Sequence, residues 1–266
     1  MIAALAAAKA ALPPPQRRVN RVVPLSGRRL SLVMAAVCAV SFVLAWPFVA
    51  NKQFLYPEDR TIELFVVSTL IAVGAAFAGT PLARRAGLAT QTFARRGRHL
   101  IRYLMVTSLL AVGVALGWML FWSFFNLAYR YLRDTREYPG NGLQLSGLFL
   151  ETGIIEEAFF RWFLLSGVVC LLALAARRPA REIGSLFFVA NLIVACIFSL
   201  AHFDLWTNGF DFGVFLNRVI MGLTFGTIYR RSGIEAAMLS HSIVDIVMAV
   251  VLTGTPWLGT PPILSP

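Results

Sequence analysis

The chain contains seven apolar stretches, each about long enough to cross a lipid bilayer as a helix. They run near residues 30–50, 62–83, 100–127, 143–175, 183–202, 212–229 and 234–253. A crossing helix needs about 20 mostly apolar residues, because its backbone polar groups have no water to bind. The sequence therefore predicts an all-α fold, a polytopic transmembrane helix bundle of about seven spans, roughly six to eight. The fourth stretch is too long for one untilted crossing, so we expect it to begin as an interfacial or broken helix.

The composition agrees with lipid as the main solvent of this chain. Of the 266 residues, 58% are hydrophobic and 14% are charged, which is more apolar surface than a soluble domain of this size can bury. The net charge is +11, but the basic residues form short clusters between apolar stretches, so we expect no nucleic-acid partner. Cys38, Cys170 and Cys196 lie singly in apolar stretches, as buried hydrophobic residues do, without the spacing of a metal site or disulfide.

The basic residues also predict the orientation of the chain. Of the 24 lysines and arginines, 17 fall in the N-terminal tail and in the loops after the second, fourth and sixth spans. Five fall in the other loops, and Arg161 and Arg218 lie inside spans. Cytoplasmic loops are enriched in Lys and Arg. We therefore expect an integral, multi-pass protein of the cell inner (plasma) membrane, with its N-terminus in the cytoplasm and its C-terminus outside.

Four regions are expected along the chain. Residues 1–29 form a basic, disordered cytoplasmic tail, since positive charge follows its alanines and Pro13–Pro15, the reverse of a cleavable signal peptide. Residues 30–142 hold the N-terminal spans, and residues 143–254 hold the remaining spans. Residues 255–266 form a Pro-rich C-terminal tail.

Ionisable residues are concentrated in the second group of spans. They are Glu151, Glu156, Glu157, Arg161, His202, Arg218, Glu235, His241 and Asp245. A charged residue at the bilayer centre costs roughly 2.5–3.5 kcal/mol, so several together must be paired, hydrated or catalytic. For any one of them alone, a polar contact between helices is an equal alternative. As a group, they indicate that function resides in the second half of the chain.

The segment Glu156-Glu157-Ala158-Phe159-Phe160-Arg161 separates two acidic side chains. Glu157 and Arg161 are four residues apart, so they share a helical face and are predicted to form an ion pair within the membrane. Glu156 is turned about 100° away. We expect Glu156 to face a water-filled cavity, where apolar surroundings suit it to accept a proton from water.

Two histidines lie within or at the end of predicted spans. His202 ends the segment Phe198-Ser199-Leu200-Ala201-His202, and by itself is equally an interfacial side chain. His241 and Asp245 are four residues apart, so the carboxylate can fix the tautomer of the imidazole, or form a purely structural hydrogen bond. His99 lies in an arginine-rich loop and is interpreted as a surface residue.

These motifs, in this order on successive spans, resemble the CPBP family. The family includes the type II CAAX prenyl endopeptidases and the bacterial Abi-type membrane proteases. The matching residues are Glu-Glu-x-x-x-Arg at 156–161, Phe-x-x-x-His at 198–202 and His-x-x-x-Asp at 241–245, together with Gly226, Tyr229 and Gly233. The resemblance covers about residues 143–250, and it implies that 143–254 is a catalytic transmembrane core.

The resemblance implies an intramembrane endopeptidase that needs no metal or other cofactor. Glu156 and His202 would activate the hydrolytic water, and His241 with Asp245 would stabilise the oxyanion of the tetrahedral intermediate. Glu157 and Arg161 would support them. The expected substrate is a membrane-associated protein or peptide, such as a C-terminal sorting signal or a bacteriocin-like or CAAX-type substrate. Neither the substrate, a prenyl requirement nor the oligomeric state follows from the sequence.

Two features of the chain depart from a simple transfer of these roles. Many relatives carry Asn where this chain has Asp245, and an ionised Asp would repel an oxyanion. Either Asp245 is protonated, or it orients His241 as the donor. His202 ends the fifth span and His241 begins the seventh, so straight helices would place them at different depths. We therefore expect a short or tilted sixth span, or a connection that dips into the bilayer, and a cavity open towards the outer half.

Three alternatives to this hypothesis remain. Two histidines and several carboxylates can bind zinc, although no His-Glu-x-x-His motif is present, so a zinc-dependent intramembrane metalloprotease is one alternative. A serine mechanism is disfavoured because Ser240 and His241 are adjacent on one helix and cannot face each other. A non-catalytic membrane scaffold or a proton-coupled transporter would use the same polar residues.

Overall fold

The computed structural model describes residues 26–49, 61–88, 98–124, 142–179, 184–202 and 212–247, and in these ranges it contains helices and short links but no β-strand. The helices are α2 (Gly27–Val49), α3 (Thr61–Arg85), α4 (Arg98–Phe124), α6 (Gly142–Glu157), η2 (Ala158–Leu165), α7 (Ser166–Ala175), α8 (Gly184–Ala201), α9 (Phe212–Ser232) and α10 (Ile234–Ile246). The predicted all-α fold is confirmed.

The helices correspond in order to the predicted spans. Within the described residues, five segments are long and apolar enough to cross a membrane, namely Gly27–Trp46, Val66–Arg85, Leu100–Trp118, Ser146–Ala175 and Phe212–Ser232. The fifth predicted span is a shorter apolar helix, Leu186–Ala201. The seventh is described only as the 13 residues of α10, and its predicted remainder lies outside the described residues, as do the two predicted tails. The chain is an integral, multi-pass membrane protein.

The fourth predicted span is one long helix with a change of pitch. Ser146–Ala175 extends over 30 residues, and α6 and α7 are joined through η2, an eight-residue π-helix. The expected interfacial or broken start is therefore not found in the described residues, where the irregularity lies in the middle of the helix. π-Helical turns occur often at functional sites. Here the π-helix begins directly after Glu157 and contains Arg161.

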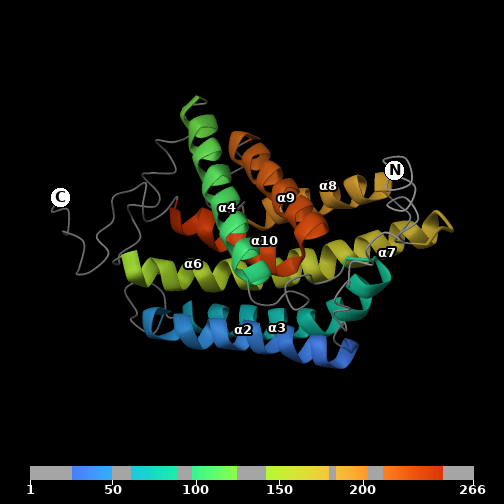
Figure 1. Cartoon of the computed structure of the whole chain (residues 1–266), viewed down its shortest axis with the longest axis horizontal. Helices are drawn as coiled ribbons and strands as arrows, with labels where there is room; N and C mark the ends of the chain where they lie inside the picture. Colours follow the sequence, from blue (N-terminus) through green and yellow to red (C-terminus); the bar gives the residue numbers. More distant parts are fainter. Residues whose placement is uncertain are drawn as a thin grey trace, which may run out of the picture.

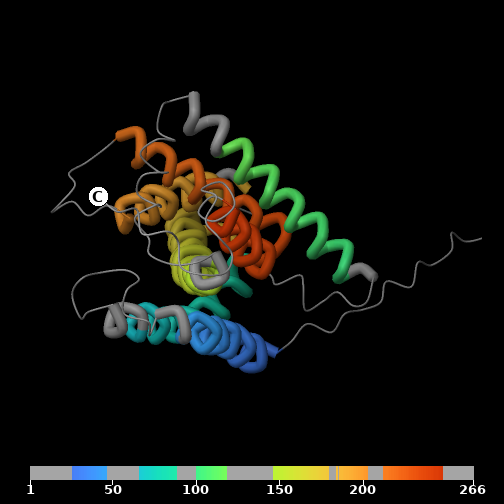
Figure 2. Tube along the Cα trace, turned by 90° about the vertical axis from the view of Figure 1, so that its left-hand side faces the viewer, coloured from blue at the N-terminus to red at the C-terminus, as the bar shows by residue number. Residues whose placement is uncertain are grey.

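The long helix α6–η2–α7 separates two groups of helices (Figure 1). α2 and α3 pack against each other and against one side of it, while α8, α9 and α10 lie on the other side (Figure 2). α4 lies outside α10 and packs against it. In Figure 1, α9 runs steeply across the direction of α6, and with 21 residues it is not the short sixth span that was one of the expectations.

Small residues allow the helices around α10 to approach closely. A Cβ atom added at Gly153 of α6 would lie 2.7 Å from the backbone nitrogen of Ser242 on α10. Close approach through small residues is characteristic of membrane helices. Gly233 joins α9 to α10 with φ of 99°, a conformation that glycine adopts without the steric cost of a side chain. The chain therefore turns sharply, and α10 lies between α6 and α9.

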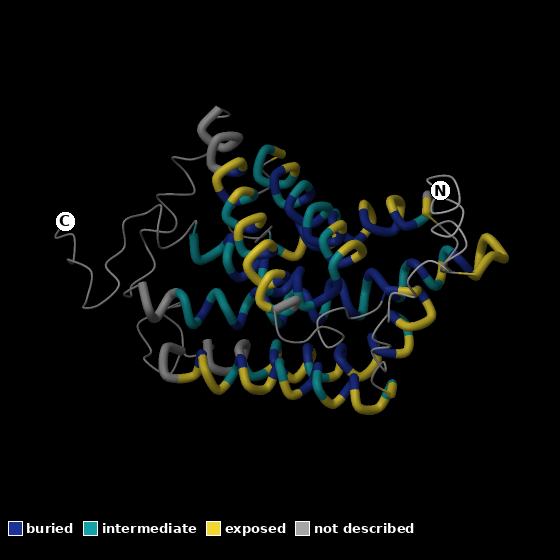
Figure 3. The backbone as a smooth tube through the Cα atoms, viewed as in Figure 1, coloured by how far each residue is buried: buried dark blue, intermediate teal, exposed yellow. Residues whose placement is uncertain are grey.

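The burial of residues differs between the central helices and the outer helices. Buried residues are concentrated along the centre of the long helix and α10, whereas the outer faces of α2 and α4 are largely exposed (Figure 3). Large hydrophobic side chains on these outer faces, such as Val43, Leu44, Leu109 and Leu110, are more than half exposed. Such a surface is stable in contact with lipid tails and not with water.

Candidate active site

Glu157 and Arg161 form the buried base of the site. Arg161 Nη1 lies 3.0 Å from Glu157 Oε1, and their side chains are 1% and 0% exposed, so the predicted ion pair is present. Arg161 Nη2 also donates to the Gly222 carbonyl at 3.4 Å, and its guanidinium carbon lies 4.4 Å from the centre of the Phe198 ring. These contacts link η2 to α8 and α9 and stabilise a charge that could not be buried alone.

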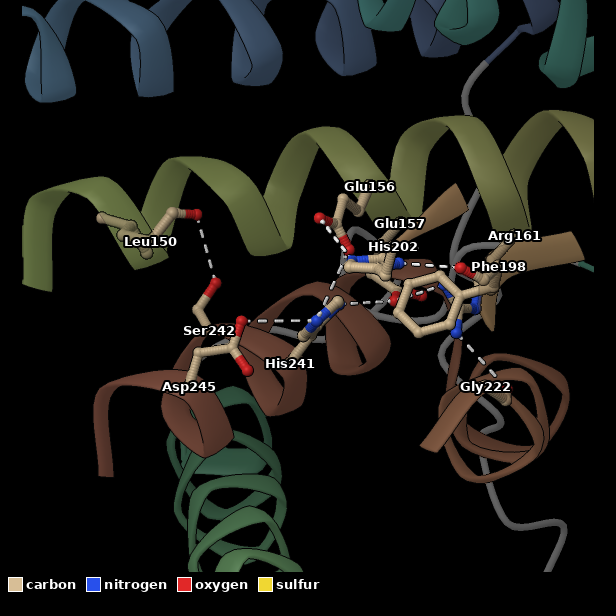
Figure 4. Close-up of polar contacts among 10 residues, drawn as sticks. All are labelled: Leu150, Glu156, Glu157, Arg161, Phe198, His202, Gly222, His241, Ser242 and Asp245. Atoms are coloured by element: carbon tan, nitrogen blue, oxygen red, sulfur yellow. Dashed lines mark hydrogen bonds and ion pairs between the residues drawn. The ribbon is translucent and has the colours of Figure 1, made fainter. Parts of the chain in front are cut away.

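Glu156 lies between the two histidines (Figure 4). Its Oε1 is 3.3 Å from His202 Nε2, and its Oε2 is 3.7 Å from His241 Nε2. The three side chains come from α6, from the residue that follows α8, and from α10. Residues separated by 85 positions in the chain therefore meet around one carboxylate.

His241 is held on one face of its ring and at one ring nitrogen. Its Nδ1 is 2.8 Å from Glu157 Oε1, the same oxygen that contacts Arg161. Its ring stacks on Phe225 of α9, with centroids 4.3 Å apart and planes inclined by 22°. The side chain is 3% exposed. Packing and the carboxylate together hold the imidazole in one orientation.

Asp245 contacts the other ring nitrogen of His241. Its Oδ2 lies 3.4 Å from His241 Nε2, the nitrogen that also faces Glu156. The predicted contact between Asp245 and His241 is present, and Glu157 contacts the second ring nitrogen, Nδ1. Glu157 and Asp245 therefore contact His241 at its two different ring nitrogens, and Asp245 lies on the side of the ring that faces Glu156.

The partners of the Nδ1 atoms determine where the ring protons lie. His202 Nδ1 is 2.7 Å from the Phe198 carbonyl, which only accepts hydrogen bonds, so Nδ1 is the donor. His241 Nδ1 likewise donates to the Glu157 carboxylate, which is paired with Arg161. When neutral, both rings therefore direct the lone pair of Nε2 towards Glu156. The Glu156 carboxylate and the two Nε2 lone pairs are all acceptors, and at these distances they require a shared proton or a donor such as water that bridges them.

One side of this cluster is open while the other is sealed. Glu156, His202 and Asp245 are 19%, 21% and 18% exposed, whereas the supporting Glu157 is fully buried. The exposed group can meet a water molecule and a substrate. The residues behind it are held by buried ion pairs and aromatic contacts. This is the division of roles that preorganised sites require.

All six sequence-predicted site residues meet in one cluster. Straight helices would have placed His202 and His241 at different depths, but both contact Glu156. Sequence reasoning missed the contact between Glu157 and His241, since a pairing between α6 and α10 has no signal in local spacing. It also left Arg218 without a role, although an arginine inside a span is itself a signal.

The alternatives can be compared with this geometry. Among the described residues, no group of three or more His, Cys, Asp and Glu side chains is arranged to hold a metal ion. Both ring nitrogens of His241 contact carboxylates, and Ser240 Oγ is buried without a hydrogen-bond partner in the described part of the chain. This arrangement offers Ser240 no base of the kind that a serine nucleophile needs.

A comparison with protein families finds one match. Residues 140–247 match the family described as Rce1-like, type II CAAX prenyl endopeptidase Rce1-like. The matched segment contains every residue of the cluster around Glu156. Comparisons with curated proteins and with solved structures gave no match.

Proposed function

We propose that this chain hydrolyses a peptide bond with water activated by Glu156 and His202. Through its residues 140–247, the chain belongs to the CPBP family of CAAX-type membrane proteases. The family is one of proteases, so the chain is an enzyme of the hydrolase class acting at the membrane. What we propose beyond this is the role of each residue and the kind of substrate. The observation that supports it most directly is the contact of Glu156 with both imidazoles.

The reaction begins with a water molecule between Glu156 and His202. The Glu156 carboxylate accepts a proton as the water oxygen attacks the scissile carbonyl carbon. The electron pair of the C=O bond moves to its oxygen, and the resulting oxyanion lies on the side of His241 and Asp245. Protonated His241 or protonated Asp245 donates a hydrogen bond to it. When the intermediate collapses, the C–N bond breaks and Glu156 returns the proton to the leaving amine.

Glu157 and Arg161 support this reaction without touching the substrate. Glu157 holds His241 Nδ1, and Arg161 neutralises the buried charge of Glu157. The water receives its orientation from His202, whose own position is held by the Phe198 carbonyl. No metal is needed for these steps, and no residue outside the cluster takes part in the proton transfer.

The proposed substrate is a membrane-associated protein or peptide. By resemblance, it is a C-terminal sorting signal or a bacteriocin-like or CAAX-type substrate. In the predicted orientation, the chain lies in the plasma membrane with its N-terminus in the cytoplasm. This orientation favours an active site that is reached from the outer half of the bilayer. A cavity on that side would favour processing of sorting signals.

A pair of glutamine variants tests the proposal. Glu156→Gln removes the base, and we expect peptide hydrolysis by the purified protein to fall by about 10²–10⁴-fold. Glu151→Gln is a matched control on the same helix, because Glu151 is also buried but lies near Thr69 of α3. It should retain activity. In cells that carry Glu156→Gln, uncut precursors should accumulate, and a proteome comparison of the membranes would identify them.

Other outcomes would favour the alternative functions. Loss of activity with strong chelators, restored by zinc, would indicate the metalloprotease. Proton-coupled uptake that survives Glu156→Gln combined with His202→Ala would indicate a transporter. Full hydrolytic activity in Glu156→Gln would contradict the proposed role of this residue.

A further inference from the structure

Arg218 of α9 is a half-buried cationic residue that the proposed mechanism does not use. It belongs to the face of α9 that also carries Met221, Gly222, Phe225 and Tyr229, at intervals of three, four, seven and eleven residues. These four residues are buried against the rest of the protein, whereas Arg218 is half-buried. The α9 face that contacts the active site therefore includes an arginine beside its buried residues.

The position of Arg218 relates it to the reactive side of the cluster. One turn further along α9, the Gly222 carbonyl accepts a hydrogen bond from Arg161, and two turns along, Phe225 stacks on His241. Arg218 is close enough to Glu156 and Asp245 for its charge to interact with both carboxylates. Among the described residues, its guanidinium makes no hydrogen bond and no ion pair.

The groups around Glu156 lack a permanent donor. Neutral His202 and His241 both direct lone pairs towards it, as their Nδ1 contacts require. Asp245 donates only when it is protonated, and His241 donates at Nε2 only after it takes a second proton. A guanidinium carries five N–H donors and keeps its charge in proteins. Arg218 thus brings a fixed positive charge and hydrogen-bond donors to the neighbourhood of Glu156 and Asp245.

We infer that Arg218 is a catalytic residue whose guanidinium binds an anionic oxygen of the substrate. That oxygen is the oxyanion formed at the scissile carbonyl. Arg218 thereby supplies the hydrogen-bond donation that a carboxylate at position 245 does not. A free C-terminal carboxylate of the substrate is the second source of the same chemistry. The inference rests on the proposed function, because both sources belong to a peptide bound at Glu156.

The test uses the full-length protein in lipid nanodiscs and a farnesylated CAAX peptide in two forms, one with a free C-terminal carboxylate and one amidated. Arg218→Gln removes the charge, and Arg231→Gln is the matched control, because Arg231 is an exposed arginine of the same helix. We expect Arg218→Gln to lower kcat by about 10²–10³-fold on both peptides, the usual effect of losing an oxyanion donor. Arg231→Gln should behave as the wild type.

The two peptides separate the two sources of the anion. A loss of kcat shared by both peptides assigns Arg218 to the oxyanion. A raised KM for the free acid alone, with the amide unaffected, assigns it to the terminal carboxylate. Wild-type kcat and KM for Arg218→Gln on both peptides would overturn the inference.

Two further variants keep the result interpretable. If Arg218→Gln does not fold, Arg218→Lys replaces it as the test variant, since lysine keeps the charge but not the planar set of donors. A lowered kcat with an unchanged unfolding temperature supports the inference. An unchanged kcat overturns it. Glu156→Gln separates this test from that of the proposed function. If the wild type cleaves neither peptide, or if Glu156→Gln remains active, the proposed function fails and this inference fails with it. If only the Arg218 variants are unaffected, the proposed function stands without it.

Discussion

The chemistry of this protein depends on which atoms of each side chain already take part in a hydrogen bond or an ion pair. Glu157 illustrates this, because a single oxygen contacts both His241 Nδ1 and Arg161 Nη1. The contact with His241 leaves its Nε2 to face Glu156. Glu156 and Glu157 are adjacent and chemically identical, yet one is 19% exposed and the other fully buried. In the proposed mechanism, their different surroundings, and not their residue type, separate the reacting group from the supporting one.

Replacing one partner of the buried ion pair should lower the free energy of unfolding more than replacing both partners. Arg161→Met leaves the Glu157 carboxylate buried without its partner, so we expect the free energy of unfolding to fall by about 3–5 kcal/mol. Arg161→Met combined with Glu157→Gln removes both charges and should cost less than the sum of the single variants. Thermal unfolding of the three variants in detergent, followed by circular dichroism, measures the coupling. Additive losses would contradict a coupled pair.

At the scale of elements, the site depends on how closely α10 approaches α6. α10 carries both His241 and Asp245, and it reaches Glu156 only because Gly153 lets the two backbones come together. Ser242 donates to the Leu150 carbonyl at 3.2 Å and so fixes the position of α10 along α6. A small displacement of α10 would lengthen the contacts of His241 with Glu156 and Glu157 together.

A single methyl group at this crossing should therefore impair both stability and activity. The Cβ of Gly153→Ala would meet the Ser242 backbone nitrogen at 2.7 Å, so the helices must separate, at a cost of about 1–3 kcal/mol. Gly113→Ala on α4 is the control, because no atom lies within 4 Å of its added Cβ. Unfolding temperature and kcat of both variants provide the measurement. Equal behaviour of the two would show that the crossing tolerates displacement.

At the scale of the whole molecule, the catalytic cluster is shielded from lipid by helices with little chemistry of their own. α2 and α3 cover one side of the long helix, and α4 covers α10 (Figure 2). Exposed leucine and valine side chains on α2 and α4 provide the surface towards lipid. Low polarity around the cluster strengthens the electrostatic interactions within it.

The orientation of the molecule is a separate prediction from its charge distribution. The excess of Lys and Arg in the tail and in the loops after the second, fourth and sixth spans predicts that the N-terminus lies in the cytoplasm. Alkaline phosphatase fused to the C-terminus should therefore be active. A fusion after residue 180, in the loop that follows the fourth span, should be inactive, whereas a green fluorescent protein at that position should fluoresce. The reverse pattern would contradict the predicted orientation.

Much of this protein follows from local patterns in the chain. The apolar stretches predict the helices, because the bilayer requires backbone hydrogen bonds to close within each segment. Spacing of four residues predicts the pair of Glu157 and Arg161, since a helix places such residues on one face. The cost of charge in a membrane marks the second half of the chain as the site of function, and three ordered motifs indicate the family.

The tertiary structure decided what no spacing within one helix can specify. Contacts between helices depend on tilt, on close approach at glycine and on the pitch of η2. These brought His202 and His241 to one carboxylate and placed Glu157 at Nδ1 of His241 while Asp245 contacts Nε2. Local sequence determines which groups share a helical face, but packing between helices determines which of their atoms meet.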